Sequence, residues 1–222
     1  AVNNAYLNEG YLFYRSTPVE VNIEGDSIDL EIRIYEGPQA RINNITITGN
    51  DRTNEHVIRR EIRSKPGELF NRSEVMRSVR ELAQLGFFDP ESINPIPVPD
   101  PENGTVDIEY QLVERANDQI EISGGWGAGM VIGTLGVRFG NFSARNLFNK
   151  DAWRPLPSGD GQNLSLRAQS NGKYYQSYSA SFVEPWLGGR KPNSLSVSLY
   201  RTVQTNGRLV EDPSRQAMQI TG

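Results

Sequence analysis

The sequence predicts an α+β region made of strand-helix-helix-strand-strand (βααββ) modules, followed by antiparallel strands of a partial transmembrane β-barrel. Three observations predict this fold class. A pattern of about 80 residues is repeated within the first half of the chain. Apolar residues follow helical spacing in two segments of that half. Beyond residue 117 a strict two-residue alternation replaces the helical spacing.

The composition excludes a helical membrane protein and leaves a β-barrel open. Only 36% of the 222 residues are apolar, and no apolar run approaches the roughly 18 residues of a spanning helix. A β-barrel has such an average because its water-facing residues dilute its lipid-facing ones. The chain has no cysteine and a single histidine, His56, and the sequence offers neither a nucleophile with a base nor a metal cluster. We therefore expect no enzymatic activity, no cofactor and no metal site.

Two pairs of matching segments define the repeat. The segment SIDLEIRIYE (27–36) matches TVDIEYQLVE (105–114), because both alternate from a small residue to a closing glutamate. Upstream, YLNEGYLF (6–13) matches LAQLGFFD (82–89), since each places glycine and an aromatic residue after a helix-like run. The matches occur in the same order at nearly equal spacing, which indicates a repeated module.

We expect residues 39–116 to form a complete module and residues 1–38 to form the C-terminal part of a preceding one. The complete module opens with an alternating stretch at 40–50, which predicts a strand. A first helix follows, which Thr53 or Asn54 can cap. Its apolar stripe consists of Val57, Ile58 and Ile62.

A second helix is predicted to begin near Asn71 or Ser73 and to end at Gly86. Its apolar residues recur at helical spacing, at Val75, Val79, Leu82 and Leu85. Two strands follow near residues 93–98 and 106–113, joined by a turn that contains proline, asparagine and glycine. The helical stripes are expected to pack on the sheet and to carry no chemistry.

Residues 117–222 alternate as β-strands do, often enough for about six strands. The first is expected at Gln119–Met130, and the pattern returns near residues 134–139, 164–169, 177–182, 194–199 and 218–221. A soluble β-sandwich would give a similar alternation. Three features favour a membrane barrel: small hydroxylated residues on the polar face, long polar joins, and aromatic residues at the strand ends. These aromatic residues are Trp126, Trp153, Tyr174, Tyr175, Trp186 and Tyr200. We also expect Arg138, Arg167 and Arg201 to line the lumen.

The glycine-rich stretch from Gly124 to Phe142 does not have the spacing of a phosphate-binding loop. Neither a G-x-G-x-x-G motif nor a following G-K-[ST] motif is present there. The glycines instead fall largely on the polar face of the predicted strands.

The module resembles a polypeptide-transport-associated (POTRA) domain. The segment at 47–62 is similar to the passage from strand to first helix in these domains, and the segment at 67–89 is similar to their second helix. Beyond the module, GGWG, NFSARNLF (141–148) and FVEPWLGG (182–189) resemble the opening strands of the BamA-like family of outer-membrane assembly factors.

This resemblance implies a role in folding β-barrel proteins and inserting them into the bacterial outer membrane, with the POTRA domains in the periplasm. The implied partners are unfolded outer-membrane β-barrel proteins, accessory periplasmic lipoproteins and outer-membrane lipid; no nucleic acid is expected. Two alternatives stay open. One is a two-partner-type polypeptide secretion pore, and the other is a soluble periplasmic binding or adhesion module.

The resemblance also implies one site at which strands could pair, and the residues themselves predict a second. The first barrel strand would form one side of a lateral gate, and its candidate residues are Gly124, Gly125, Trp126, Gly127 and Gly129. The earlier module would accept client or partner strands along an edge that contains Val19, Val21 and Ile23, because this segment has no proline after Pro18. In the complete module the corresponding strand carries Pro95, Pro97 and Pro99, which are expected to blunt its edge.

Overall fold

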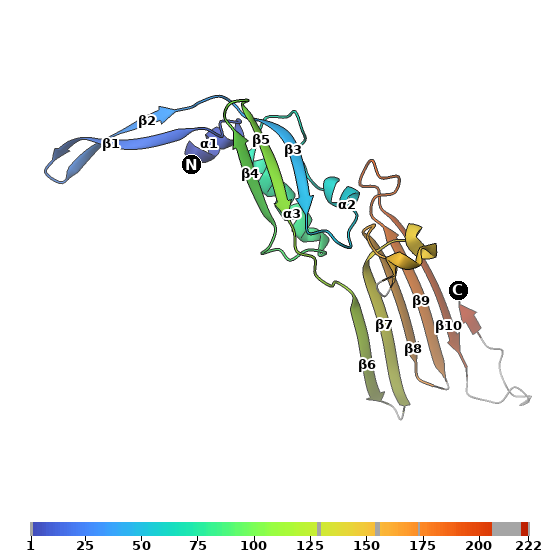
Figure 1. The fold of residues 1–222 in the computed structure, drawn as a ribbon. Helices are drawn as coiled ribbons and strands as arrows, with labels where there is room; N and C mark the ends of the chain where they lie inside the picture. Colours follow the sequence, from blue (N-terminus) through green and yellow to red (C-terminus); the bar gives the residue numbers. More distant parts are fainter. Residues whose placement is uncertain (1, 128–129, 154–155, 173, 206–218, 222) are drawn as a thin grey trace, which may run out of the picture. The chain divides into compact units, whose positions relative to one another are not determined.

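The computed structural model describes residues 2–127, 130–153, 156–172, 174–205 and 219–221 (Figure 1). The chain divides into two compact units, Ala1–Arg115 and Ala116–Gly222. Among the helices of the described residues, none is long and apolar enough to cross a membrane.

The first unit begins with helix α1 (Val2–Asn8) and the hairpin of strands β1 (Arg15–Glu24) and β2 (Ser27–Tyr35) (Figure 1). The two strands form an antiparallel two-stranded sheet. Every residue of β2 is exposed, including its apolar residues. These are Ile28, Leu30, Ile32 and Ile34.

The complete module follows with the predicted order of elements, which is confirmed. Its elements are β3 (Arg41–Thr48), α2 (Glu55–Arg59), α3 (Arg72–Leu85), β4 (Asn94–Asp100) and β5 (Thr105–Gln111). The three strands form one sheet in the order β3-β5-β4. Strand β5 pairs in parallel with β3 and antiparallel with β4, so β4 lies at one edge of the sheet.

The repeat places the same alternation in two different environments. The residues in β5 and just after it that match the exposed apolar residues of β2 belong to the buried core of the module. They are Val106, Ile108, Tyr110 and Leu112, all at most 4% exposed. In the complete module this face of the sheet packs against residues of both helices, among them Val57, Ile58 and Leu82.

The ends of helix α3 form as the sequence predicts. The Asn71 side chain accepts a hydrogen bond from the backbone N–H of Glu74 at 3.0 Å, and Gly86 ends the helix with a φ of 74°. A left-handed residue at this position favours glycine because it has no Cβ atom. At α2 the prediction is only half right: Asn54 stands at the N-cap, but its side chain makes no capping hydrogen bond.

Gly49 is required where β3 meets the end of the module. Its φ is +83°, and a Cβ atom at this position would lie 1.9 Å from the carbonyl oxygen of Leu112. The backbone N–H of Leu112 donates to the carbonyl of Thr48 at 3.0 Å. A larger residue would therefore separate two strands that hydrogen bonds hold together.

The second unit is one antiparallel sheet of six strands in chain order (Figure 1). The strands are β6 (Gln119–Gly127), β7 (Met130–Phe142), β8 (Gln162–Ser170), β9 (Tyr175–Glu184), β10 (Leu195–Gln204) and β11 (Gln219–Thr221). The prediction of one strand from Gln119 to Met130 is wrong at its end. Met130 begins β7 and pairs with Gly127 of β6. The alternating pattern continues from one strand into the next, so it does not show where the first strand ends.

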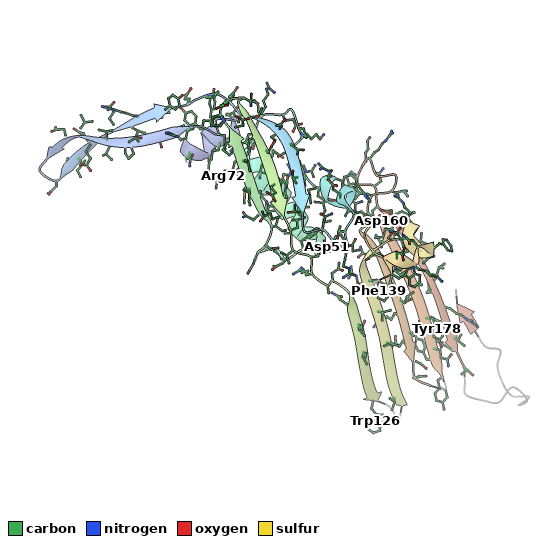
Figure 2. All side chains as sticks on the ribbon, in the orientation of Figure 1. Asp51, Arg72, Trp126, Phe139, Asp160 and Tyr178 are labelled. Carbon is green, nitrogen blue, oxygen red and sulfur yellow. The ribbon has the colours of Figure 1, made fainter. Side chains whose placement is uncertain are left out.

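The long join between β7 and β8 is tied to the sheet by a buried polar network. Ser143 Oγ donates to Asp160 Oδ2 at 2.6 Å, and the Ala144 N–H donates to Gln162 Oε1 at 2.6 Å. Gln162 Nε2 in turn donates to Glu184 Oε2 at 2.7 Å. Figure 2 shows Asp160 and Trp126 at opposite ends of the sheet, so this network fixes the end that is far from Trp126.

The register places the alternating side chains in rows across the sheet. One row is apolar and contains Ile120, Val137, Leu166, Ala180 and Leu199. The adjacent row contains Glu121, Gly136, Arg167, Ser179 and Tyr200. The predicted alternation is therefore confirmed. The apolar face is open, since Ile120 is 74% exposed and Leu199 is 70% exposed.

One residue of β10 lies on a face other than the one expected. Arg201 pairs with Tyr178 and so lies on the apolar face, whereas Tyr200 pairs with Ser179 on the polar face. The expectation that Arg201 lines the lumen is wrong. Strand β10 pairs with β9 without any register shift. The face on which each residue of β10 lies therefore follows from the alternation along the strand and not from the polarity of the residue.

Candidate functional site

Strand β6 lies at the edge of the six-stranded sheet. It pairs with β7 through nine successive residues, and no described strand pairs with its other side. An edge strand presents a row of unpaired N–H and C=O groups, to which another strand can pair. The structure therefore places the predicted gate strand where a strand can be added.

The predicted gate residues gather at one end of this edge strand. Gly124 pairs with Gly133, Gly125 with Ile132, Trp126 with Val131 and Gly127 with Met130. The Gly124–Gly133 pair has no side chain on either strand, so it lacks the cross-strand contact that normally stabilises a sheet. Gly129 lies outside the described residues.

Packing does not require glycine at the two central gate positions. A Cβ atom at Gly125 would meet no atom within 4 Å, and one at Gly124 would lie 3.8 Å from the carbonyl oxygen of Ile132. Neither residue has a positive φ. Glycine in a strand is less stable than alanine by about 0.5–1 kcal/mol, so both positions weaken β6 without a steric reason.

An ion pair ties β6 to the sheet across an intervening strand. Glu121 Oε1 on β6 lies 3.2 Å from Arg167 Nη2 on β8, and Gly136 of β7 stands between them in the same row. A Cβ atom at Gly136 would lie 3.2 Å from Glu121 Oε2. The absence of a side chain at Gly136 thus leaves room for the pair. No pattern in the sequence predicts this ion pair, because the pair depends on the register of three strands.

A second glycine of β7 receives the residue that precedes β6. A Cβ atom at Gly140 would lie 2.1 Å from Asn117 Nδ2 and 2.5 Å from Asn117 Cγ. Only glycine fits there while Asn117 keeps its place. We call Gly136 and Gly140 the socket glycines, because each receives a side chain from the edge segment at 117–121.

Strand β4 is the edge of the POTRA-like sheet and carries prolines at every second position. Pro95, Pro97 and Pro99 pair with Tyr110, Ile108 and Val106 of β5. Alternate residues of a strand direct their backbone groups to the same side, and proline has no N–H to donate. The ladder to β5 therefore uses the residues between the prolines. The free edge at the prolines presents carbonyl oxygens without donors.

A groove of about 430 Å³ lies between α3 and this edge strand. Its lining is mainly apolar and includes Leu12, Val75, Met76, Val79, Pro95 and Pro97. Because the edge beside it lacks N–H donors, the groove offers apolar contact without a complete ladder of backbone hydrogen bonds.

The other predicted pairing edge, on β1, is interrupted by a β-bulge. The register shifts between Glu20 and Asn22, so that Val19 pairs with Glu31 while Ile23 pairs with Ile28. The predicted edge residues Val19, Val21 and Ile23 all belong to β1. The extra residue interrupts the regular ladder between Val19 and Ile23. Val21, at the bulge, is 60% exposed.

Comparison with known proteins agrees with both units. Residues 40–115 match the POTRA family model, described as a surface antigen variable number repeat. The chain is 31% identical over 187 residues to the outer membrane protein assembly factor BamA of Neisseria meningitidis serogroup B, covering 84% of this chain and 22% of that protein. It is 28% identical over 183 residues to the chloroplastic outer envelope protein 80 of Oryza sativa subsp. japonica, covering 78% of this chain and 26% of that protein.

A solved structure shows the same fold. The crystal structure of Haemophilus ducreyi BamA lacking POTRA domains 1–3 superposes with a TM-score of 0.72 and 22% identity, over 92% of this chain and 36% of that chain. The fold is thus an α+β POTRA domain followed by antiparallel strands of a partial transmembrane β-barrel. Residues 40–115 belong to the POTRA family, and the chain around them is BamA-like in sequence and in fold.

Proposed function

We propose that this chain acts in outer-membrane protein assembly, by folding client β-barrel proteins and inserting them into the bacterial outer membrane. The POTRA domain lies in the periplasm, and strands β6–β11 form part of the barrel wall. Two observations support this placement: the similarity to BamA proteins and the exposed apolar face of the sheet. In this function the protein makes and breaks no covalent bond, so it is not an enzyme.

The mechanism rests on the cost of an unpaired strand edge in lipid. No water replaces a lost hydrogen bond in the hydrocarbon region, so each unpaired backbone group there is costly. Opening of the barrel beside β6 exposes such an edge. A client strand that pairs with this edge provides hydrogen-bond partners for the backbone groups of both chains. Strand β6 then serves as one side of a lateral gate.

The observation that carries the proposal is the pair of gate glycines without a steric role. Gly124 and Gly125 have room for a side chain and have ordinary backbone angles, yet they lower the stability of the edge strand. This weakness serves a strand that must separate from its neighbour and pair again. The competing explanation for a glycine is close packing, in which neighbouring atoms leave no room for a side chain. This explanation applies instead to the socket glycines of β7.

The POTRA region contributes a second pairing surface. Strand β1 keeps its N–H donors beyond Pro18, whereas the free edge of β4 lacks them at three positions. We therefore assign the capture of client strands, or of accessory periplasmic lipoproteins, to the β1 edge that contains Val19, Val21 and Ile23. The bulge at Val21 limits this pairing to the segments on either side of it.

The test replaces Gly124 and Gly125 with threonine in the full-length protein reconstituted into lipid vesicles. Threonine favours strands, and the two changes together should stabilise β6 by about 2 kcal/mol. Insertion of a client barrel should then slow by about 30-fold. A matched control places threonine at Ser165 and Ser179, in the interior strands β8 and β9, and should insert clients at the normal rate.

Two results would contradict the proposal. Equal insertion rates for the gate variant and the control would remove the role of the glycines. Transport of a soluble passenger across the vesicle membrane, without insertion of client barrels, would indicate a secretion pore.

A further inference from the structure

Arg201 is a charged residue on the apolar face of the barrel sheet. Its row contains Ile122, Leu135, Ala168 and Tyr178. Among the described residues of this face the acidic side chain is Glu184, which lies at the other end of β9 and bonds to Gln162 and to the backbone of Trp186. No described residue forms an ion pair or a hydrogen bond with the Arg201 guanidinium.

The position of Arg201 along the strand gives its distance from one end of the sheet. It lies three residues before the end of β10, and its partner Tyr178 lies three residues after the start of β9. At about 3.3 Å per residue, this is roughly 10 Å from the strand ends. The cost of an arginine on the lipid face falls steeply from the bilayer centre to the headgroup region. Tyrosine is enriched in that same region.

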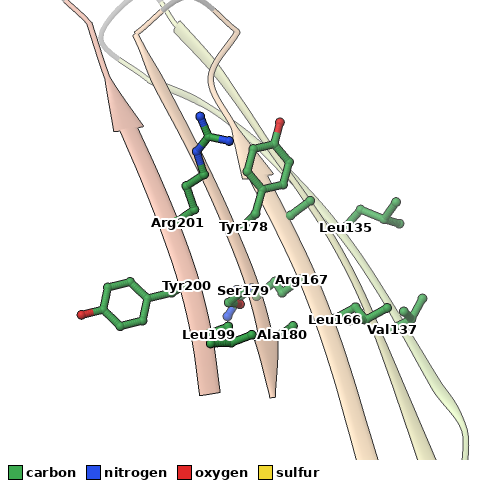
Figure 3. Close-up of a pocket in the computed structure, with 11 residues that line it drawn as sticks. Leu135, Val137, Leu166, Arg167, Tyr178, Ser179, Ala180, Leu199, Tyr200 and Arg201 are labelled. Carbon is green, nitrogen blue, oxygen red and sulfur yellow. The ribbon is translucent and has the colours of Figure 1, made fainter. Parts of the chain in front are cut away.

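An apolar hollow lies beside the two residues. Its volume is about 500 Å³, and its apolar lining includes Leu135, Leu166, Ala168, Ala180 and Leu199. Figure 3 shows Arg201 and Tyr178 projecting side by side from neighbouring strands at this hollow. The small side chains of Ala168 and Ala180 stand among larger neighbours, which leaves space for an acyl chain.

We propose that Arg201, Tyr178 and this hollow form a binding site for an anionic membrane lipid. The guanidinium pairs with the headgroup phosphate through parallel N–H donors. The Tyr178 hydroxyl donates a further hydrogen bond, and an acyl chain covers the alanines. The positive charge, without an acidic partner in the described residues, is the feature that selects an anionic lipid over a neutral one. The inference rests on the proposed placement in the outer membrane.

The topology assigns the site to one leaflet. The POTRA domain is followed in the chain by β6, which begins at Gln119. Because the strands are antiparallel and in chain order, the joins at 143–161 and 185–194 lie at the same end of the sheet as Gln119. Arg201 lies towards the opposite end. With the POTRA domain in the periplasm, the lipid at Arg201 belongs to the outer leaflet.

The test measures which lipid stays with the full-length protein. The protein is reconstituted into vesicles of equal parts phosphatidylglycerol and phosphatidylcholine with identical acyl chains, and native mass spectrometry counts the lipids retained. The wild type should retain phosphatidylglycerol preferentially. Arg201→Gln should lower this preference by about tenfold, and Arg201→Lys should have an intermediate effect because it keeps the charge but loses the planar donors. Arg190→Gln, in the exposed turn at the other end of the sheet, is the matched control and should behave as the wild type.

The outcomes separate this inference from the proposed function. Equal lipid preference in the wild type and in Arg201→Gln overturns the lipid site. Client insertion in pure phosphatidylcholine vesicles should be unchanged in Arg201→Gln. Failure of wild-type protein to insert clients there would overturn the proposed function and leave the lipid measurement intact.

Discussion

Glu121 Oε1 on the edge strand β6 lies 3.2 Å from Arg167 Nη2 on β8, although β7 runs between the two strands. The pair can form because the residue of β7 between them is Gly136. The ion pair therefore links the gate strand to the second strand behind it, on the polar face of the sheet. An edge strand weakened by glycine at one end is held by an ion pair near its other end.

We predict that breaking this ion pair loosens β6. Both side chains are about half exposed, and ion pairs of this kind contribute about 0.2–1 kcal/mol. Glu121→Gln should therefore raise the amide hydrogen exchange of residues 119–127 by up to about fivefold in the full-length protein. The exchange of β9 should not change.

A charge reversal distinguishes this ion pair from a general effect of mutation. The single variants Glu121→Arg and Arg167→Glu should both loosen β6, and the double variant should restore slow exchange. High salt should reduce the difference between wild type and Glu121→Gln. A double variant that exchanges as fast as the single ones would show that the pair does not hold the strand.

We predict opposite effects of alanine at a socket glycine and at a gate glycine. Alanine at Gly140 would collide with Asn117, whereas alanine at Gly125 would meet open space. Gly140→Ala should force the Asn117 side chain aside and destabilise the start of β6 by about 1 kcal/mol, and Gly125→Ala should be neutral or stabilising. The measurement is amide exchange of β6. The added change Asn117→Gly should rescue Gly140→Ala; a loss that persists in the double variant would contradict the collision.

We predict that the prolines of β4 keep strands away from the POTRA edge. Crosslinkers placed along β1 and β4 should label client strands mainly at β1. Replacing Pro95, Pro97 and Pro99 with valine restores three N–H donors at the free edge, and labelling at β4 should then approach that at β1. The control Ile96→Val changes a residue that points its backbone towards β5 and should leave labelling unchanged. Strong labelling of wild-type β4 would refute the blunting.

We predict that the POTRA domain loses stability at alkaline pH through Tyr110. Burial raises the pKa of the Tyr110 phenol to about 12, and the Ser78 hydroxyl opposes this shift. The pKa in the unfolded chain is about 10, so the neutral phenol stabilises the fold fully below pH 10. This contribution, roughly 2–3 kcal/mol, is lost as the pH rises from 10 to 12.

The variant Tyr110→Phe isolates this residue from other alkaline titrations. It should make unfolding of residues 40–115 less dependent on pH between 10 and 12 than in the wild type. Urea denaturation of the full-length protein, followed by amide exchange in the POTRA domain, gives the comparison. Identical pH dependence in both proteins would contradict the prediction, because it would mean that the Tyr110 pKa is the same in the folded and unfolded chain.

The sequence determined the elements that depend on local chemistry. Asn71 and Gly86 mark the ends of α3 because capping and a left-handed residue require particular residue types within one helical turn. The apolar stripe of α3 and the alternation beyond residue 117 follow from the periods of helix and strand. The three prolines of β4 likewise show in the sequence that its edge lacks donors.

Only the tertiary structure decided which residues of different strands meet. Socket glycines and gate glycines look alike in the sequence, and they differ because Gly140 lies opposite Asn117 while Gly125 faces open space. The bulge at Val21 and the place of Arg201 on the apolar face are likewise set by pairing with a neighbouring strand. A period of two fixes which residues of one strand share a face. It does not fix turns, bulges or strand register, because these depend on contacts between residues that are distant in the sequence.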